Sequence, residues 1–128
     1  DISQKVLLQA QNGVYPQDSL KDMPSEWIRK YFNRVDNTDQ YEVTSALKSN
    51  VIFKPFNLMD PIQFKIPFDV IFCRNVMIYF NQQTKDALVD RFYDSTNHGG
   101  HLIIGLSETI NKSNARYKYV MPAVYRKI

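Results

Sequence analysis

The chain has 128 residues, of which 44% are hydrophobic and 23% are charged, and its formal net charge is +3. These values predict one globular domain with a real core, and the scattering of basic among acidic residues argues against nucleic-acid binding. No apolar run approaches the roughly 20 residues that span a bilayer, so we expect no membrane insertion. The chain opens on Asp1-Ile2-Ser3 instead of Met, and we therefore expect a fragment of a longer protein.

Thiol and metal chemistry have little support in the sequence. The single cysteine, Cys73, excludes an internal disulfide and fits a reducing cytoplasm, where we expect the protein to reside. It lies inside an apolar run, which favours a small hydrophobic role over that of a nucleophile. His98 and His101 flank a Gly-Gly pair without a convincing third ligand, so no metal site is expected.

Two helices are predicted in the first third of the chain. Residues 3–12 carry apolar side chains at helical spacing, with Ser3 as the N-cap and Gly13 as the stop signal. A second helix begins near residues 22–26. Its apolar side chains form one stripe, which we interpret as a packing surface: Trp27, Ile28, Tyr31 and Phe32.

Two strands are predicted next, at residues 41–44 and 51–56, with a polar separator at residues 48–50. Pro55 has no backbone N–H to donate, so it indicates a strand end or a sheet edge.

The run from Phe68 to Phe80 is the most informative stretch of the chain. It begins as an almost continuous apolar segment rich in β-branched and aromatic residues, which is typical of a central strand buried on both faces of a mostly parallel sheet. Arg74 and Asn75 follow at its carboxyl end, where open α/β sheets bind their ligands. The alternative is that these two residues only mark the point where the strand surfaces.

A helix is predicted after this run, at about residues 82–96, with Asn81 as its N-cap. We expect residues 97–100 to end it, with a glycine in the left-handed conformation. The side chains expected to face inward are Ala87, Leu88, Phe92 and Ser95.

The last part of the chain predicts a buried strand at residues 101–106 and a hairpin at the sheet edge, with strands at 117–120 and 123–126. The order of the elements therefore predicts an α/β fold, a doubly wound, mostly parallel sheet that ends in an antiparallel hairpin.

The residues also resemble a known family, the CheR-type chemotaxis receptor glutamate O-methyltransferases, which use S-adenosylmethionine. The resemblance depends on the highly specific string Cys-Arg-Asn-Val-Met-Ile-Tyr-Phe at residues 73–80 and extends over essentially the whole chain. Supporting pieces are Asp1-Ile2-Ser3, Gly13-Val14-Tyr15, Arg29-Lys30-Tyr31-Phe32, Asn57-Leu58 and Gly105-Leu106-Ser107-Glu108.

The resemblance implies a Rossmann-like methyltransferase fold, of which this chain would be the C-terminal part, with a small antiparallel β-subdomain inserted at about residues 36–54. Family members also have an N-terminal helical domain and a first strand with a glycine-containing loop, and neither is in this chain. The sheet would then expose a backbone edge, and dimerisation through that edge is one way to cover it.

The resemblance implies a set of cofactor-binding residues. Asp1 would accept hydrogen bonds from the ribose hydroxyls; the alternatives are a carboxylate that only caps a helix and a disordered terminus. Asn57 and Leu58 would contact adenine, the alternative for Asn57 being an ordinary polar loop. Arg74 and Asn75 would line the cofactor pocket.

Two of the residues would act on the substrate. Arg74 would also hold the incoming glutamate carboxylate, because guanidinium and carboxylate pair with matched planar geometry. Tyr79 would lie beside the transferring methyl group and orient the acceptor; the alternative is a packed aromatic at a helix start.

The implied function is methyl transfer from S-adenosylmethionine to glutamate side chains of the cytoplasmic domain of chemotaxis receptors. Some members of the family also bind a receptor tail peptide through the β-subdomain, and the sequence leaves this open. The alternative function is a non-catalytic module of the same fold that binds the cofactor or docks on the receptor.

Overall fold

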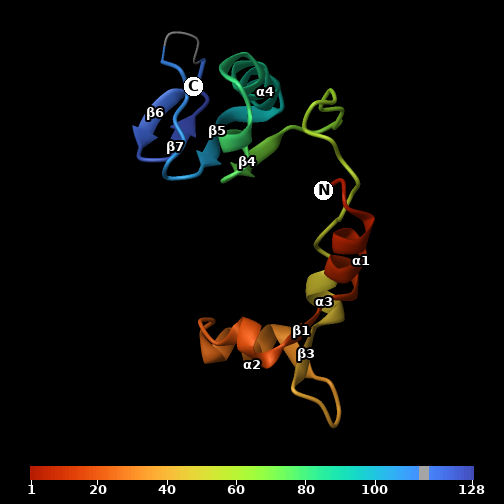
Figure 1. Cartoon of the computed structure of the whole chain (residues 1–128). Helices are drawn as coiled ribbons and strands as arrows, with labels where there is room; N and C mark the ends of the chain where they lie inside the picture. The colour runs from red at the N-terminus through yellow and green to blue at the C-terminus, as the bar shows by residue number, and fades with distance from the viewer. Residues whose placement is uncertain (113–115) are drawn as a thin grey trace. The chain divides into compact units, whose positions relative to one another are not determined.

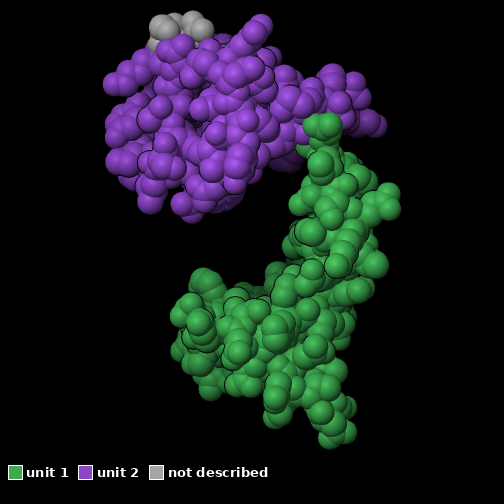
Figure 2. Space-filling view, in the orientation of Figure 1, with its two compact units in different colours: residues 1–57 green, residues 58–128 purple. Residues whose placement is uncertain are grey.

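The computed structural model describes residues 1–112 and 116–128. The chain forms two compact units, Asp1–Asn57 and Leu58–Ile128 (Figure 2). Each unit has its own sheet (Figure 1).

Unit 1 begins with helix α1, Gln4–Asn12. The Ser3 hydroxyl accepts a hydrogen bond from the Val6 N–H at 3.3 Å, and Gly13 ends the helix with φ of 64°. Both ends were predicted from the sequence, because serine satisfies a free N–H at a helix start and glycine adopts positive φ without steric cost.

A three-stranded antiparallel sheet follows in unit 1, with strands β1 (Val14–Pro16), β2 (Phe32–Arg34) and β3 (Gln40–Val43) in the order β1-β3-β2. The remaining elements are η1 (Gln17–Leu20), α2 (Ser25–Tyr31) and α3 (Ser45–Lys48). Helix α2 confirms the second predicted helix, and β3 the first predicted strand. Within the predicted insertion at residues 36–54 lie β3 and α3, whereas β1 and β2 come earlier in the chain.

Two predictions for unit 1 are wrong. Trp27 is 57% exposed and α2 buries no residue, so Trp27 is not part of a packed stripe. Residues 51–56 form no strand. A strand requires a neighbour to bond its backbone, and in this segment the Phe56 N–H bonds the carbonyl of Asp1 at 2.9 Å without forming a ladder.

Unit 2 contains a four-stranded mixed sheet in the order β4-β5-β7-β6. Strands β4 (Phe68–Cys73) and β5 (Thr96–Ile104) are parallel, whereas β6 (Lys118–Met121) and β7 (Val124–Arg126) form the predicted antiparallel hairpin, with β6 at the edge. The α/β class is confirmed, but in the described part of the sheet one strand pair is parallel and two are antiparallel.

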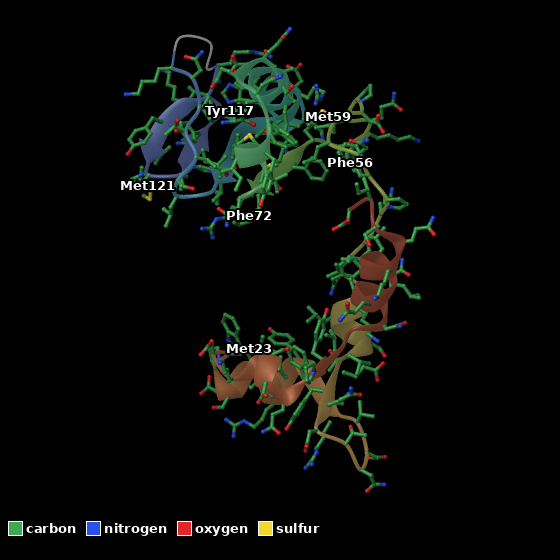
Figure 3. All side chains as sticks on the ribbon, viewed as in Figure 1. Met23, Phe56, Met59, Phe72, Tyr117 and Met121 are labelled. Atoms are coloured by element: carbon green, nitrogen blue, oxygen red, sulfur yellow. The ribbon has the colours of Figure 1, made fainter. Side chains whose placement is uncertain are left out.

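Strand β4 lies at the other edge of this sheet and is not central. Its side chains alternate: Ile71 and Cys73 face the core, whereas Val70 and Phe72 are exposed, Phe72 by 70% (Figure 3). The apolar composition of β4 suits burial on both faces, but the described residues cover only one of them.

Helix α4 (Gln82–Asp94) packs on the core face of this sheet. The Asn81 side chain accepts the Thr84 N–H at 2.9 Å, as expected for an N-cap. Leu88 and Phe92 are buried as predicted, but Ala87 is exposed and Val89 is buried in its place.

The end of α4 differs from the prediction. The helix stops at Asp94 and β5 already begins at Thr96, so Gly99, with φ of 82°, lies in an irregular part of β5 and not at the helix end. The Thr96 hydroxyl is buried and bonds the hydroxyl of Tyr117 at 2.6 Å, which ties β5 to the segment before β6. In the described ranges no helix has the length and apolarity that a membrane span requires.

Candidate functional site

The candidate site lies where the two parallel strands of unit 2 end. Cys73 is opposite Ile104 in the last pair of the β4–β5 ladder. Arg74 and Asn75 follow β4 and are exposed, while Gly105 follows β5 and is buried. We call these three residues, with Glu108, the rim. Arg74 and Asn75 are thus accessible side chains at the carboxyl end of a parallel pair, where ligands bind in open α/β sheets.

Asn75 has an unusual backbone conformation, with φ of 60°. L-residues rarely adopt this left-handed region, and asparagine is one of the few that tolerate it. The turn directs the chain out of β4 into the short helix η2, Met77–Tyr79.

Gly105 sits against this turn with no room for a side chain. A Cβ atom added there would overlap the Asn75 carboxamide oxygen and would lie 2.8 Å from the Glu108 Oε2 atom. The rim is therefore close-packed beneath the exposed side chains of Arg74 and Asn75.

Glu108 is a residue of the site for which no role was predicted from the sequence. Its side chain is only 7% exposed, and its Oε2 atom accepts the N–H of Gly105 at 2.7 Å and the N–H of Asn75 at 3.1 Å. Acidic residues are seldom buried without such partners. The available signal was an acidic residue four positions after the end of β5, followed by the apolar Ile110.

Cys73 is buried directly beneath the rim. Burial, with a smaller contribution from the negative charge of Glu108, raises the pKa of the Cys73 thiol from 9.0 to about 11. The thiol is therefore protonated at neutral pH, which agrees with a hydrophobic role, because the thiolate is the nucleophilic form.

Leu58 and Tyr79 also belong to unit 2. Leu58 packs against the core, and its carbonyl accepts a hydrogen bond from Nη2 of Arg91, on α4, at 2.6 Å. Tyr79 is 82% exposed, so it is not the packed aromatic that we considered as an alternative.

Asp1 and Asn57 belong to unit 1, and both are exposed. The Asp1 carboxylate accepts the N–H of Ser3 at 2.8 Å, just before α1. This contact closes a turn before the helix, whose N-cap is Ser3, and it leaves the remaining lone pairs of the Asp1 carboxylate for other donors. Among the residues that the structure describes, no group of His, Cys, Asp or Glu side chains is arranged to hold a metal ion.

Comparison with known proteins identifies the family of this chain. The model of the CheR methyltransferase SAM-binding domain matches residues 1–125. The chain belongs to this family. Its sequence is 43% identical over 128 residues to a chemotaxis protein methyltransferase of Borreliella burgdorferi, covering 99% of this chain and 44% of the relative. It is 36% identical over 131 residues to the chemotaxis protein methyltransferase of Escherichia coli, covering 98% of this chain and 45% of the relative.

The chain therefore spans less than half the length of the curated relatives that it matches. A third relative, chemotaxis protein methyltransferase Cher2 of Pseudomonas putida, is 34% identical over 123 residues, which are 94% of this chain and 44% of that protein. The family's domain is named for the binding of S-adenosylmethionine, which is therefore the expected cofactor.

The rim offers chemistry that fits this cofactor. S-adenosylmethionine carries a carboxylate, an ammonium group, ribose hydroxyls and a nucleobase, and all of these need polar partners. Arg74 supplies a guanidinium for an anionic group, and Asn75 supplies a carboxamide that both donates and accepts. Both residues are exposed, and the carboxamide oxygen of Asn75 lies against Gly105, where a larger residue would displace it.

Proposed function

We propose that this chain is part of the catalytic domain of a protein-glutamate O-methyltransferase, which forms methyl esters on chemotaxis receptors. The family match over residues 1–125 is the observation that carries the proposal. The exposed arginine and asparagine after β4 support it, because they follow a parallel strand at its carboxyl end, where open α/β sheets bind ligands.

In this proposal Arg74 and Asn75 bind the cofactor from unit 2, together with Leu58, whose position Arg91 fixes through the 2.6 Å bond to its carbonyl. For Asp1 and Asn57, which belong to unit 1, contacts with the ribose and the adenine stay predictions from the family resemblance. When bound, S-adenosylmethionine supplies a methyl group activated by its sulfonium charge.

The protein needs no general base for this reaction. A glutamate carboxyl has a pKa of about 4.3 and is already ionised at neutral pH. The task of the site is therefore to align the carboxylate and to remove part of its water. Because an anion is neutralised in the step, strong stabilisation of the carboxylate alone would slow it. We therefore infer that Arg74 orients the acceptor and that the exposed Tyr79 hydroxyl assists.

The test is a methyl-transfer assay with the full-length protein and the cytoplasmic domain of a chemotaxis receptor. We expect labelled methyl groups on receptor glutamates, and no labelling of a receptor whose acceptor glutamates are replaced by glutamine. Arg74→Ala should reduce transfer far more than it lowers the midpoint of thermal unfolding.

Arg126→Ala is the matched control. Arg126 is also an exposed arginine of this sheet, but it is opposite His101, toward the other end of β5 from the rim. Equal losses of activity in the two variants would contradict the proposed role of Arg74. Cofactor binding without transfer by the full-length protein would instead indicate the non-catalytic module.

A further inference from the structure

Glu108 connects the ends of two parallel strands that are far apart in the sequence. Its Oε2 atom accepts the N–H of Asn75, after β4, and the N–H of Gly105, after β5. Its own N–H donates to the carbonyl of Gly105 at 3.0 Å. The carboxylate therefore continues the connection between the strands past the last ladder pair, Cys73 and Ile104.

Both N–H groups need this acceptor. Beyond the last pair the ladder no longer supplies carbonyls to these donors, and the buried N–H of Gly105 in particular would cost free energy without a partner. The carboxylate is well suited, because an ionised carboxylate only accepts hydrogen bonds and one oxygen can receive two. Bonds to a charged acceptor are also stronger than bonds to a neutral one.

The bond to Asn75 has a particular consequence, because Asn75 is the residue in the left-handed conformation. A backbone held there without support relaxes to other regions of φ and ψ. Such a change at Asn75 would redirect both its own side chain and that of its neighbour Arg74.

We propose that Glu108 is a positioning residue for cofactor binding: it fixes the backbone at Asn75 and so holds the side chains of Arg74 and Asn75 toward the ligand. This inference rests on the proposed function, in which those two side chains contact the cofactor. Glu108 itself acts through the strand ends and does not touch the ligand.

Two substitutions separate the effect of the length of the Glu108 side chain from the effect of its charge. Glu108→Gln keeps the length, and its amide oxygen can receive both N–H groups. Its NH2 group then takes the place of Oε1, which has no hydrogen-bond partner among the described residues. Glu108→Asp keeps the charge but is one methylene shorter, so it cannot reach both donors.

The experiment measures the affinity of the full-length protein for S-adenosylhomocysteine by calorimetry, with thermal unfolding of each variant recorded alongside. We expect Glu108→Asp to weaken binding about tenfold and Glu108→Gln by no more than about threefold. Amide hydrogen exchange at Asn75 and Gly105 should accelerate in the aspartate variant and change little in the glutamine variant.

A double-mutant cycle with Asn75→Gly tests whether Glu108 acts through Asn75. Glycine keeps the left-handed backbone and removes the carboxamide. If the two residues act together, adding Glu108→Asp to Asn75→Gly should weaken binding by clearly less than the tenfold seen alone.

Three results would overturn the inference. The first is a larger loss of affinity in Glu108→Gln than in Glu108→Asp, and the second is that the effects of Glu108→Asp and Asn75→Gly on affinity are independent in the cycle. The third is a lower unfolding midpoint of Glu108→Asp with unchanged affinity. A failure of the proposed site is recognised separately. In that case Arg74→Ala and Asn75→Gly bind S-adenosylhomocysteine as tightly as the wild type, and the inference falls with it.

Discussion

At the scale of single residues, Asn75 combines a strained backbone with an exposed side chain. The left-handed conformation costs roughly 1–2 kcal/mol for an ordinary L-residue and almost nothing for glycine. We therefore expect Asn75→Ala to have a free energy of unfolding about 1 kcal/mol below that of Asn75→Gly, as measured by chemical denaturation. Both variants lack the carboxamide, so both should bind S-adenosylhomocysteine more weakly than the wild type.

The stability measurement tests the backbone conformation of Asn75, and the affinity measurement tests the contact of its side chain with the cofactor. Equal stability of the alanine and glycine variants would contradict the left-handed conformation at this position. Wild-type affinity in Asn75→Gly would show that the carboxamide does not contact the cofactor.

Cys73 predicts a dependence of stability on alkaline pH. Its pKa is about 11 in the folded protein, against 9.0 for an ordinary thiol. Below pH 9 both states hold the proton and the thiol has no effect. As the pH rises from 9 toward 11 the unfolded chain loses the proton first, so the free energy of unfolding falls.

Cys73→Ala should therefore show a shallower loss of stability over this pH range in denaturant titrations. Tyr117, whose pKa burial raises from 10.0 to about 12, is present in both proteins and does not affect the comparison. Parallel curves for the two proteins between pH 9 and pH 11 would contradict the raised pKa.

The caps of the helices were predictable at the scale of elements. Ser3, Gly13 and Asn81 occupy the predicted positions because capping depends on a hydrogen bond or a dihedral angle within a few residues. Burial depends on distant partners, and here the predictions were weaker. Trp27 and Ala87 were expected inside and are exposed, although each belongs to a correctly predicted helix.

The N-cap of α4 gives a prediction at the same scale. Asn81→Ala removes the bond to the Thr84 N–H and should lower the free energy of unfolding by about 1 kcal/mol. Asn81→Asp keeps an acceptor at the helix start and should remain within about 0.5 kcal/mol of the wild type. Chemical denaturation of the two variants tests this, and an equal loss in both would argue against the cap.

The candidate site was predictable in part. The position of Arg74 and Asn75 after a strand follows from a local pattern, and the structure places them at the end of β4. The contribution of Glu108 is not local, because it depends on the parallel pairing that brings residues 75 and 108 together. For the same reason the sequence did not predict that Gly105 packs against Asn75.

At the scale of the whole molecule, the uncovered side of β4 is the main feature. Val70 and Phe72 are exposed on a strand whose outer edge has no neighbour within the described sheet. Unpaired apolar edges favour association. We therefore expect the isolated 128-residue chain to associate through this strand, as predicted from the sequence.

The isolated chain should accordingly self-associate in sedimentation velocity experiments, and Phe72→Lys should reduce this association. Leu8→Lys is the control, because Leu8 is also exposed but lies on α1 in unit 1. An equal reduction of self-association in Phe72→Lys and Leu8→Lys would refute the role of β4.

The most direct test of the account is a crystal structure of the full-length protein with S-adenosylhomocysteine. The account predicts that the ligand lies at the carboxyl ends of β4 and β5, within hydrogen-bond distance of the Arg74 or Asn75 side chain, and that Glu108 still accepts the N–H groups of Asn75 and Gly105. A ligand bound elsewhere, with Arg74 and Asn75 contacting only protein, would contradict it.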